Sequence, residues 1–147
     1  MNITKATLED IPQLCDLLKI LFSQEAEFSP DREKQSRGLE MIISNPDSGF
    51  IIKAEQDGRI VGMTNILFMV STFLGERVCV LEDMVVHPDM RGQDIGTLII
   101  KKAQQAAREA GCRRITLLTD NDNYRAQSFY ENNGFSMSPM VTFRKMI

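Results

Sequence analysis

The pattern that most limits how this chain folds is a strand, a helix and a second strand over residues 77–119. Residues 77–86 and 114–119 are strand-like runs rich in apolar and β-branched residues. Between them, residues 95–110 place apolar side chains on one helical face, and Gly111 follows where helices commonly end. Two strands joined through a helix are expected to lie parallel, with a right-handed crossover.

The strands before this unit are joined by short turns, so we expect them to run antiparallel. Residues 50–55 and 59–70 flank the turn Gln56-Asp57-Gly58, and residues 74–76 lead into the strand at 77–86. The pattern also predicts a strand at 2–6, a helix whose apolar stripe ends at Phe22, helices at 30–44 and 123–133, and one or two strands within 135–147. Asp10 with Gln13 suggests a capping box for the first helix, and Ser29-Pro30 suggests the start of the second.

These elements predict an α/β (α+β) protein. We expect residues 1–147 to form one domain, with a mixed, mostly antiparallel sheet of six to seven strands and helices on both faces. The 17 basic and 20 acidic side chains give a net charge of −3 and therefore no reason to expect a nucleic-acid partner. The longest mostly apolar run, residues 60–70, is too short to span a membrane, and the first residues lack a signal-peptide pattern.

The cysteines indicate the compartment. Cys15, Cys79 and Cys112 are odd in number and far apart, and His87 is the single histidine. We therefore expect buried, reduced thiols in a cytoplasmic protein, and no metal site.

An anion site is predicted where residues 91–97 join the third strand-like run to the helix. The first amides of a helix have no intrahelical partner, and the helix dipole favours negative charge there. Arg91 adds positive charge, and Gly92 and Gly96 let a phosphate approach the backbone. The segment matches neither G-x-x-x-x-G-K-[ST] nor G-x-G-x-x-G, and an ordinary turn before a helix is the alternative.

A second segment makes the pattern more specific. The turn Arg91-Gly-Gln-Asp94-Ile-Gly96 resembles the signature (R/Q)-x-x-G-x-(G/A) of the GNAT superfamily of acyl-CoA-dependent N-acyltransferases. The family's second motif resembles a later stretch, in Asn123, Ala126, Phe129, Tyr130, Gly134 and Phe135. The resemblance covers nearly the whole chain in element order. It implies the GNAT fold, acetyl-CoA as cosubstrate without a metal, and direct attack by a primary amine in a ternary complex.

One residue departs from the family pattern. Asp94 stands where the family prefers its first glycine, which places a negative charge beside the expected pyrophosphate. We therefore expect weakened cofactor binding. A GNAT-fold module that binds acyl-CoA without catalysis stays open as the alternative function.

The resemblance assigns roles to named residues. Tyr130 corresponds to the tyrosine that protonates the leaving thiolate, and Glu82 to a glutamate that accepts the amine's proton through water. The expected cofactor-binding residues are Met84, Val85, Val86, Arg91, Gly92, Gln93, Asp94, Ile95, Gly96, Thr97 and Asn123. Alternation along the strand predicts that Glu82 and Asp83 face opposite sides of the sheet. Simple packing of Tyr130 and structural ion pairing of either acid are the alternatives.

The acceptor is expected between the first two helices and their loop. The predicted substrate-binding residues are Phe22, Glu25, Glu27, Phe28 and Asp83. The acidic character of this region, to which Asp31 adds, favours a cationic small-molecule or peptide amine, although solvated loop charges explain the same pattern. A nucleophilic Cys79 is disfavoured because no histidine is placed to activate it. A homodimer through an edge strand at residues 141–145 is also expected.

Overall fold

The computed structural model describes residues 1–24 and 30–147. Its strands are β1 (Asn2–Lys5), β2 (Gly49–Gln56), β3 (Arg59–Ser71), β4 (Glu76–Val86) and β5 (Ile115–Leu117). Its helices are α1 (Ile11–Gln24), α2 (Arg32–Ile43), α3 (Ile95–Glu109) and α4 (Tyr124–Asn132), with 3-10 turns at Leu8–Asp10 and Pro88–Met90.

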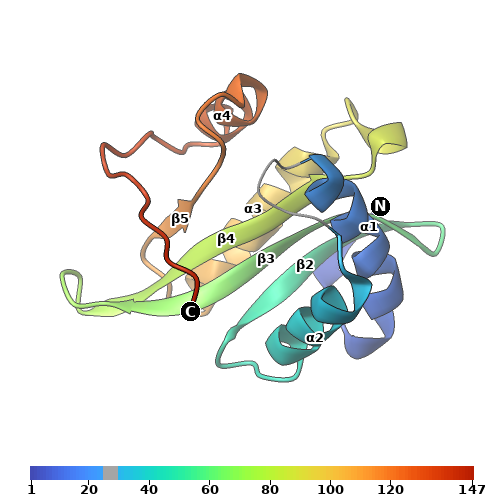
Figure 1. Ribbon diagram of the computed structural model, residues 1–147, viewed down its shortest axis with the longest axis horizontal. Coiled ribbons are helices and arrows are strands. Elements are labelled where there is room, and N and C mark those ends of the chain that lie inside the picture. Colours follow the sequence, from blue (N-terminus) through green and yellow to red (C-terminus); the bar gives the residue numbers. More distant parts are fainter. Residues whose placement is uncertain (25–29) are drawn as a thin grey trace.

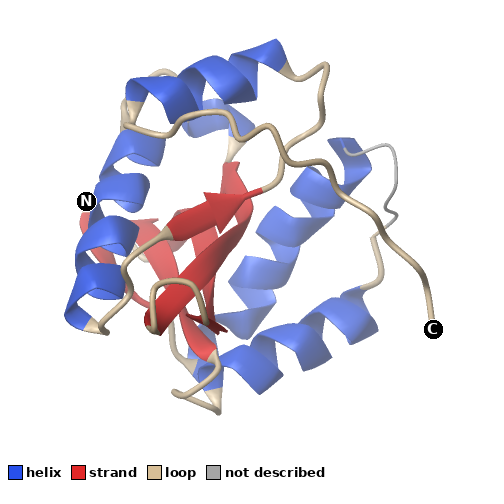
Figure 2. Cartoon of the chain, turned by 90° about the vertical axis from the view of Figure 1, so that its left-hand side faces the viewer, coloured by secondary structure: helices blue, strands red, loops and turns tan. Residues whose placement is uncertain are grey.

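The strands form one sheet in the order β1-β2-β3-β4-β5 (Figure 1). The first four run antiparallel to their neighbours, and β5 runs parallel to β4 after the crossover through α3. Helices cover both faces of the sheet (Figure 2). The mixed sheet, its antiparallel majority and the helices on both faces confirm the predicted fold class.

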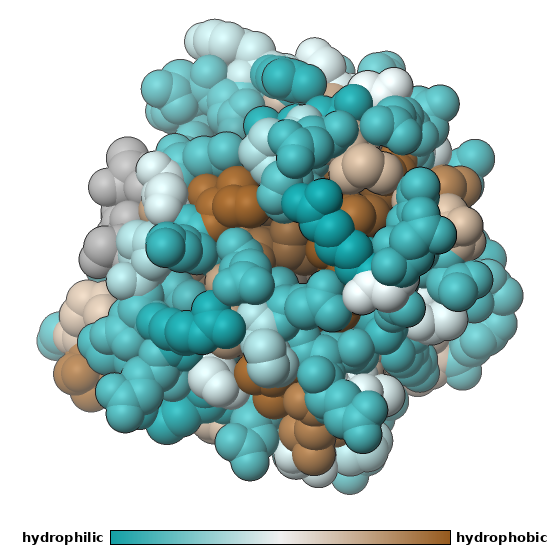
Figure 3. Space-filling model, turned by 90° about the vertical axis from the view of Figure 1, so that its right-hand side faces the viewer, coloured by the Kyte–Doolittle hydropathy of each residue, from teal (hydrophilic) through white to brown (hydrophobic). Residues whose placement is uncertain are grey.

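Two apolar cores lie on opposite faces of the sheet. On one face, α3 packs Ile99, Ile100 and Ala103 against strand residues such as Ile52 and Leu81. On the other, α1 and α2 contribute the buried leucines Leu14, Leu17, Leu18 and Leu39. From the side that carries the β2–β3 turn, apolar side chains appear as patches between polar ones (Figure 3).

The predicted six to seven strands are wrong by number, because five strands form within the described residues. Residues 135–147, where one or two strands were expected, follow an extended path without strand pairing (Figure 1). Pro139 offers no backbone N–H, and the neighbouring β5 is only 3 residues long, so the segment has a short template to pair with. The apolar side chains from Met137 onward, Phe143 among them at 93% exposure, stay at the surface.

The helix starts also differ from those predicted. The Asp10 carboxylate accepts from the Thr7 N–H at 2.8 Å, so Asp10 closes a cap with Thr7 instead of opening one with Gln13. The Gln13 amide oxygen instead accepts from the Ile60 N–H at 2.8 Å. Helix α2 begins at Arg32 because the Asp31 side chain caps it, accepting from the Lys34 N–H at 3.2 Å.

Candidate active site

A β-bulge in β4 shapes the centre of the site. Asn65 of β3 pairs with Glu82, and Met63 pairs with Val85, so two steps along β3 match three along β4. The extra residue is accommodated at Asp83, whose φ of 53° lies in the left-handed region. A bulge re-aims side chains and ends the simple alternation of the strand.

Because of this bulge, Glu82 and Asp83 line the same pocket. The predicted separation of the two acids onto opposite faces is therefore wrong. Leu81 and Met84, which flank them, both pack into the core on the α3 face. Strand periodicity alone does not reveal an inserted residue, and the left-handed backbone at Asp83 was the missing information.

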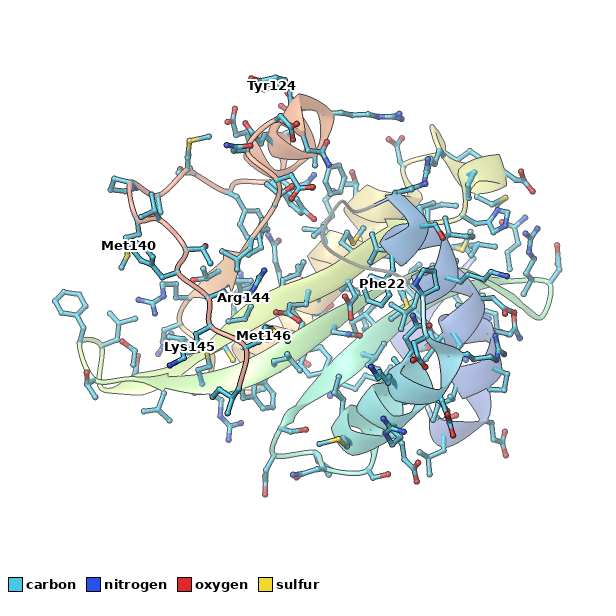
Figure 4. All side chains as sticks on the ribbon, viewed as in Figure 1. Phe22, Tyr124, Met140, Arg144, Lys145 and Met146 are labelled. Atoms are coloured by element: carbon cyan, nitrogen blue, oxygen red, sulfur yellow. The ribbon has the colours of Figure 1, made fainter. Side chains whose placement is uncertain are left out.

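The pocket lies between β3, β4, α1 and α2 and has a volume of about 320 Å³. Its walls are largely apolar, and its charged side chains are Asp31, Lys34, Glu82 and Asp83. Phe22, predicted to bind substrate, lines it from α1 (Figure 4). The structure thus brings Phe22, Glu82 and Asp83 together. The predicted substrate residues Glu25, Glu27 and Phe28 lie outside the described residues.

Two polar residues of β3, which the sequence pattern did not assign to the site, hold the bulge. Thr64 and Asn65 are buried, and the Thr64 hydroxyl donates to the Glu82 carbonyl at 3.0 Å. The Asn65 amide nitrogen donates to the Asp83 carboxylate at 2.6 Å. Two polar residues in the middle of an otherwise apolar strand were the signal that pointed to them.

The pairing of β4 with β5 ends at Leu81, immediately before the bulge. The two strands pair only at Cys79–Leu81 of β4, after which β4 continues to Val86. The His87 N–H bonds to the Val61 carbonyl at 2.8 Å on the β3 side. Alternation then turns the backbone groups of Val86 and Met84 to the outer edge of β4. There, Nε of Arg91 donates to the Val86 carbonyl at 3.2 Å, which ties the turn to the strand end.

The predicted anion site lies at the start of α3. Gly92 and Asp94 have φ of 77° and 61°, so both use the left-handed region. Asp94 occupies the N-cap position, but its side chain caps no amide. Since the Leu98 N–H is the first to bond back into the helix, to the Asp94 carbonyl at 3.1 Å, the amides of Ile95, Gly96 and Thr97 precede the helical bonding pattern.

Helix α4 packs against this helix start. A Cβ built on Gly96 would meet ring atoms of Phe129 at 3.1 and 3.2 Å and the Met84 methyl at 3.4 Å, so glycine permits the close approach. The half-buried Tyr130 makes edge contacts with Phe129 and Phe135, with centroids 5.3 and 5.7 Å apart. The second predicted motif thus lies beside the first.

Two predicted residues have structural roles that bear on their chemistry. The Asn123 side chain caps α4 by accepting from the Ala126 N–H at 3.1 Å. Cys79 is a buried free thiol, and burial, with a smaller effect from Cys112, raises the pKa of Cys79 to about 12. A thiol with that pKa is a poor nucleophile at neutral pH, in line with the disfavoured Cys79 mechanism.

Glu82 and Tyr130 lie on different faces of the sheet. Glu82 lines the pocket on the α1/α2 face, whereas Tyr130 packs against the core on the α3 face. Within residues 1–24 and 30–147, no cluster of three or more potential metal ligands is found. Among the described helices, none has the length and apolar character that crossing a bilayer requires.

Comparison with known proteins supports this reading of the fold and motifs. Residues 11–135 match the model of the Acetyltransferase (GNAT) family. The uncharacterized N-acetyltransferase YhfO of Bacillus subtilis is 30% identical over 92% of this chain and 89% of its own. An aminoalkylphosphonate N-acetyltransferase of Salmonella typhimurium is 27% identical over 90% of this chain and 83% of its own. The aminoglycoside N-acetyltransferase AAC(6')-Iy, solved in complex with CoA, shares the fold with a TM-score of 0.83 at 20% identity, over 99% of this chain and 93% of its own.

Proposed function

Since the chain belongs to the acetyltransferase (GNAT) family, we propose that it transfers the acetyl group of acetyl-CoA to a primary amine. The amine attacks directly in a ternary complex. The observation that carries this proposal is that β4 continues to Val86 after its pairing with β5 has ended at Leu81. The unpaired part of β4 therefore has a different set of side chains on each face of the sheet. An acidic pocket adjoins β4 on the α1/α2 face, and Tyr130 with the start of α3 lies on the other.

The residues present fit acetyl-CoA, which supplies an activated acetyl thioester when bound. The uncapped amides of Ile95, Gly96 and Thr97, with the adjoining turn of Arg91, Gly92, Gln93 and Asp94, would hold the pyrophosphate. The outer edge of β4 would bind the pantetheine amides as an added strand does, through the backbone groups of Met84 and Val86 on either side of Val85. Asn123 would contact the same arm through atoms that its capping bond leaves available.

Three groups of this chain then perform the chemistry. Glu82 accepts a proton from the ammonium, through water, so that the amine nitrogen can form its bond to the acetyl carbon. A backbone N–H at the outer edge of β4 donates to the oxyanion that develops on the acetyl oxygen. As the carbon–sulfur bond breaks, Tyr130 protonates the departing thiolate, and the second proton released by the new amide nitrogen restores the Tyr130 hydroxyl. Glu82 is exposed enough for water to reach it, which a water relay needs.

The pocket favours a small cationic acceptor. Three carboxylates, Asp31, Glu82 and Asp83, face one ammonium, Lys34, so the charged lining carries an excess of two negative charges. A volume of about 320 Å³ lies at the lower end of ligand pockets, which run to about 1,000 Å³. The relative from Salmonella typhimurium is named for a small amine that carries a phosphonate. With Lys34 as the one cation in the described lining, we propose that this chain prefers amines without an anionic group.

The test is CoA release with an amine panel that contains 1,4-diaminobutane, an aminoalkylphosphonate and a short peptide with a free N-terminus. We expect turnover with the diamine and much less with the phosphonate. A protein that binds acetyl-CoA but acetylates no amine would support the second candidate, an acyl-CoA-binding module. The specific observation in favour of that candidate is Asp94 at the predicted phosphate site.

Two further properties belong to this proposal. The edge strand expected at residues 141–145 does not form, but the exposed apolar side chains Met140, Val141, Phe143 and Met146 favour a homodimer through this C-terminal segment (Figure 4). Light scattering of the full chain and of a chain ending at residue 135 tests this pairing, since the shortened chain should be monomeric. The three free, buried cysteines are typical of a reducing cytoplasm.

A further inference from the structure

Asn65 has a polar side chain in the interior that the proposed chemistry does not yet use. We propose that Asn65 is a positioning residue, which holds the Asp83 carboxylate at the pocket so that Asp83 binds the ammonium group of the acceptor. This inference rests on the proposed function, because it assigns the acceptor's anchor within that site.

The first support is geometric. Asn65 is 3% exposed, and its amide nitrogen lies 2.6 Å from Oδ2 of Asp83. The two residues lie on neighbouring strands, next to the register shift, and both line the pocket. The left-handed backbone at Asp83 turns its side chain to the pocket, and the bond from Asn65 fixes one carboxylate oxygen there.

The second support is that this arrangement leaves a buried acceptor unsatisfied. Among the buried side-chain polar atoms of the described residues, Oδ1 of Asn65 is the one without a hydrogen-bond partner. Native proteins avoid such groups unless another requirement retains them. A strand whose only task was to pack would gain by an apolar residue here, so the amide donor to Asp83 explains why a polar side chain is kept.

The third support is the charge of the donor. A lysine or arginine at this position would fix Asp83 equally well but would neutralise it. An amide donates a hydrogen bond while leaving the carboxylate its negative charge. A carboxylate that keeps its charge attracts the acceptor's ammonium, which makes Asp83 selective for cations over neutral or anionic groups.

The experiment measures KM for 1,4-diaminobutane, KM for acetyl-CoA and kcat in a double-mutant cycle of Asn65→Val and Asp83→Asn. Calorimetric titration with 1,4-diaminobutane gives a readout independent of turnover. Asn65→Ala serves as a second variant if the valine variant does not fold. Ser71→Ala is the matched control, because Ser71 is also a buried polar residue of β3 but hydrogen bonds to Leu74, away from the pocket.

Asn65→Val should raise KM and the dissociation constant for the diamine about 10-fold, while KM for acetyl-CoA and kcat stay within about two-fold. In the Asp83→Asn background, the same substitution should change diamine affinity by less than about two-fold, since it acts through Asp83. Additive effects of the two substitutions, equal losses for diamine and acetyl-CoA, or no diamine binding by the unmodified chain would overturn the inference. Asn65-dependent diamine binding without any acetyl transfer would instead support Asn65 and Asp83 as the anchor and refute the proposed enzymatic function.

Discussion

Asp94→Gly should tighten acetyl-CoA binding without weakening the fold. Asp94 is exposed at the start of α3, with φ at 61°, and its side chain caps no amide. Glycine adopts this backbone conformation freely, whereas the left-handed region costs an ordinary L-residue about 1–2 kcal/mol, less for aspartate. This relief offsets the loss of a favourable helix-dipole interaction of about 0.3–1 kcal/mol. We therefore expect a free energy of unfolding within about 1 kcal/mol of the unmodified protein.

The effect on binding comes from the removed charge. A unit charge about 5–8 Å from a phosphate charge, at an effective dielectric constant of about 20–80, contributes about 0.5–3 kcal/mol of repulsion. Salt screening brings this toward the lower end, where a gain of about 0.5–1.4 kcal/mol is about two- to ten-fold in affinity. Asp94→Asn is the matched control, because asparagine also tolerates the left-handed region but carries no charge.

The assay is calorimetric titration of the three proteins with acetyl-CoA at low salt and at about 1 M salt, where the Debye length is about 3 Å. Both variants should bind more tightly at low salt, and the gain should shrink at high salt. Tighter binding by the glycine variant alone would assign the effect to the missing Cβ. Equal or weaker binding by both variants at low salt would refute the reasoning, because the Asp94 carboxylate would then not oppose the phosphates.

Four other changes test the remaining parts of the site and fold. Tyr130→Phe should lower kcat by about 10²–10⁴-fold with little change in acetyl-CoA affinity, since only the proton donor is lost; steady-state kinetics and titration measure both. Glu82→Gln should reduce the rate most at low pH, where more of the amine is protonated, as a pH–rate profile would show. Gly96→Ala should lower the free energy of unfolding by about 1 kcal/mol and raise KM for acetyl-CoA, because the added Cβ pushes Phe129 and α4 away from the cofactor turn. Lys53→Met should lower the free energy of unfolding at pH 7 by about 1–3 kcal/mol in urea titrations, because it removes a half-buried partner at 2.8 Å from Asp10.

The stabilisation that Lys53 provides should depend on pH. Burial works to raise the pKa of Asp10, but hydrogen bonds from Lys53 and from the Thr7 amide outweigh it, and the pKa falls below 3.8. A lowered folded-state pKa stabilises the protein above the unfolded value and ceases to do so as pH falls through the folded value. The difference in free energy of unfolding between Lys53→Met and the unmodified chain should therefore become smaller below pH 3.8.

Each of these four changes has an outcome that would contradict it. An unchanged kcat in Tyr130→Phe would assign that ring to packing alone, and a parallel pH–rate profile in Glu82→Gln would make Glu82 structural. If Gly96→Ala binds acetyl-CoA as tightly as the unmodified chain, then the packing of α4 against Gly96 does not contribute to acetyl-CoA binding. If the difference in free energy of unfolding between Lys53→Met and the unmodified chain is constant from pH 7 to pH 2.5, then the stabilisation by Lys53 does not come from its interaction with Asp10.

Much of the fold was predictable because its signals are local and periodic. The apolar face of α3 indicates a helix between two strands, which predicts the parallel pair β4 and β5. The short turns between β2, β3 and β4 predict the antiparallel part of the same sheet. The turn before α3 and the motif on α4 were recognisable because helix starts and close packing need particular residues at fixed spacing. Those requirements appear in the structure as the uncapped amides after Asp94 and the contact of Gly96 with Phe129.

The acceptor side was less predictable because it depends on contacts distant in sequence. The sequence around Asp83 contains no signal for a left-handed backbone conformation within a strand. The inserted residue becomes visible only in the pairing of β4 with β3. Asn65 is 18 residues from Asp83 in sequence, so its role emerges only when the strands are aligned. One or two strands were also predicted near the C-terminus. A strand forms only where a neighbouring strand offers free backbone groups, and β5 is only 3 residues long.

The most direct test of the central claim is a two-substrate kinetic study with acetyl-CoA and 1,4-diaminobutane, in which released CoA and N-acetylated diamine are quantified together. Direct attack in a ternary complex predicts equal amounts of the two products, intersecting double-reciprocal lines and no acetylated protein by intact mass spectrometry. Parallel lines with an acetyl group retained on the protein, or CoA release without any N-acetylated diamine, would contradict the account.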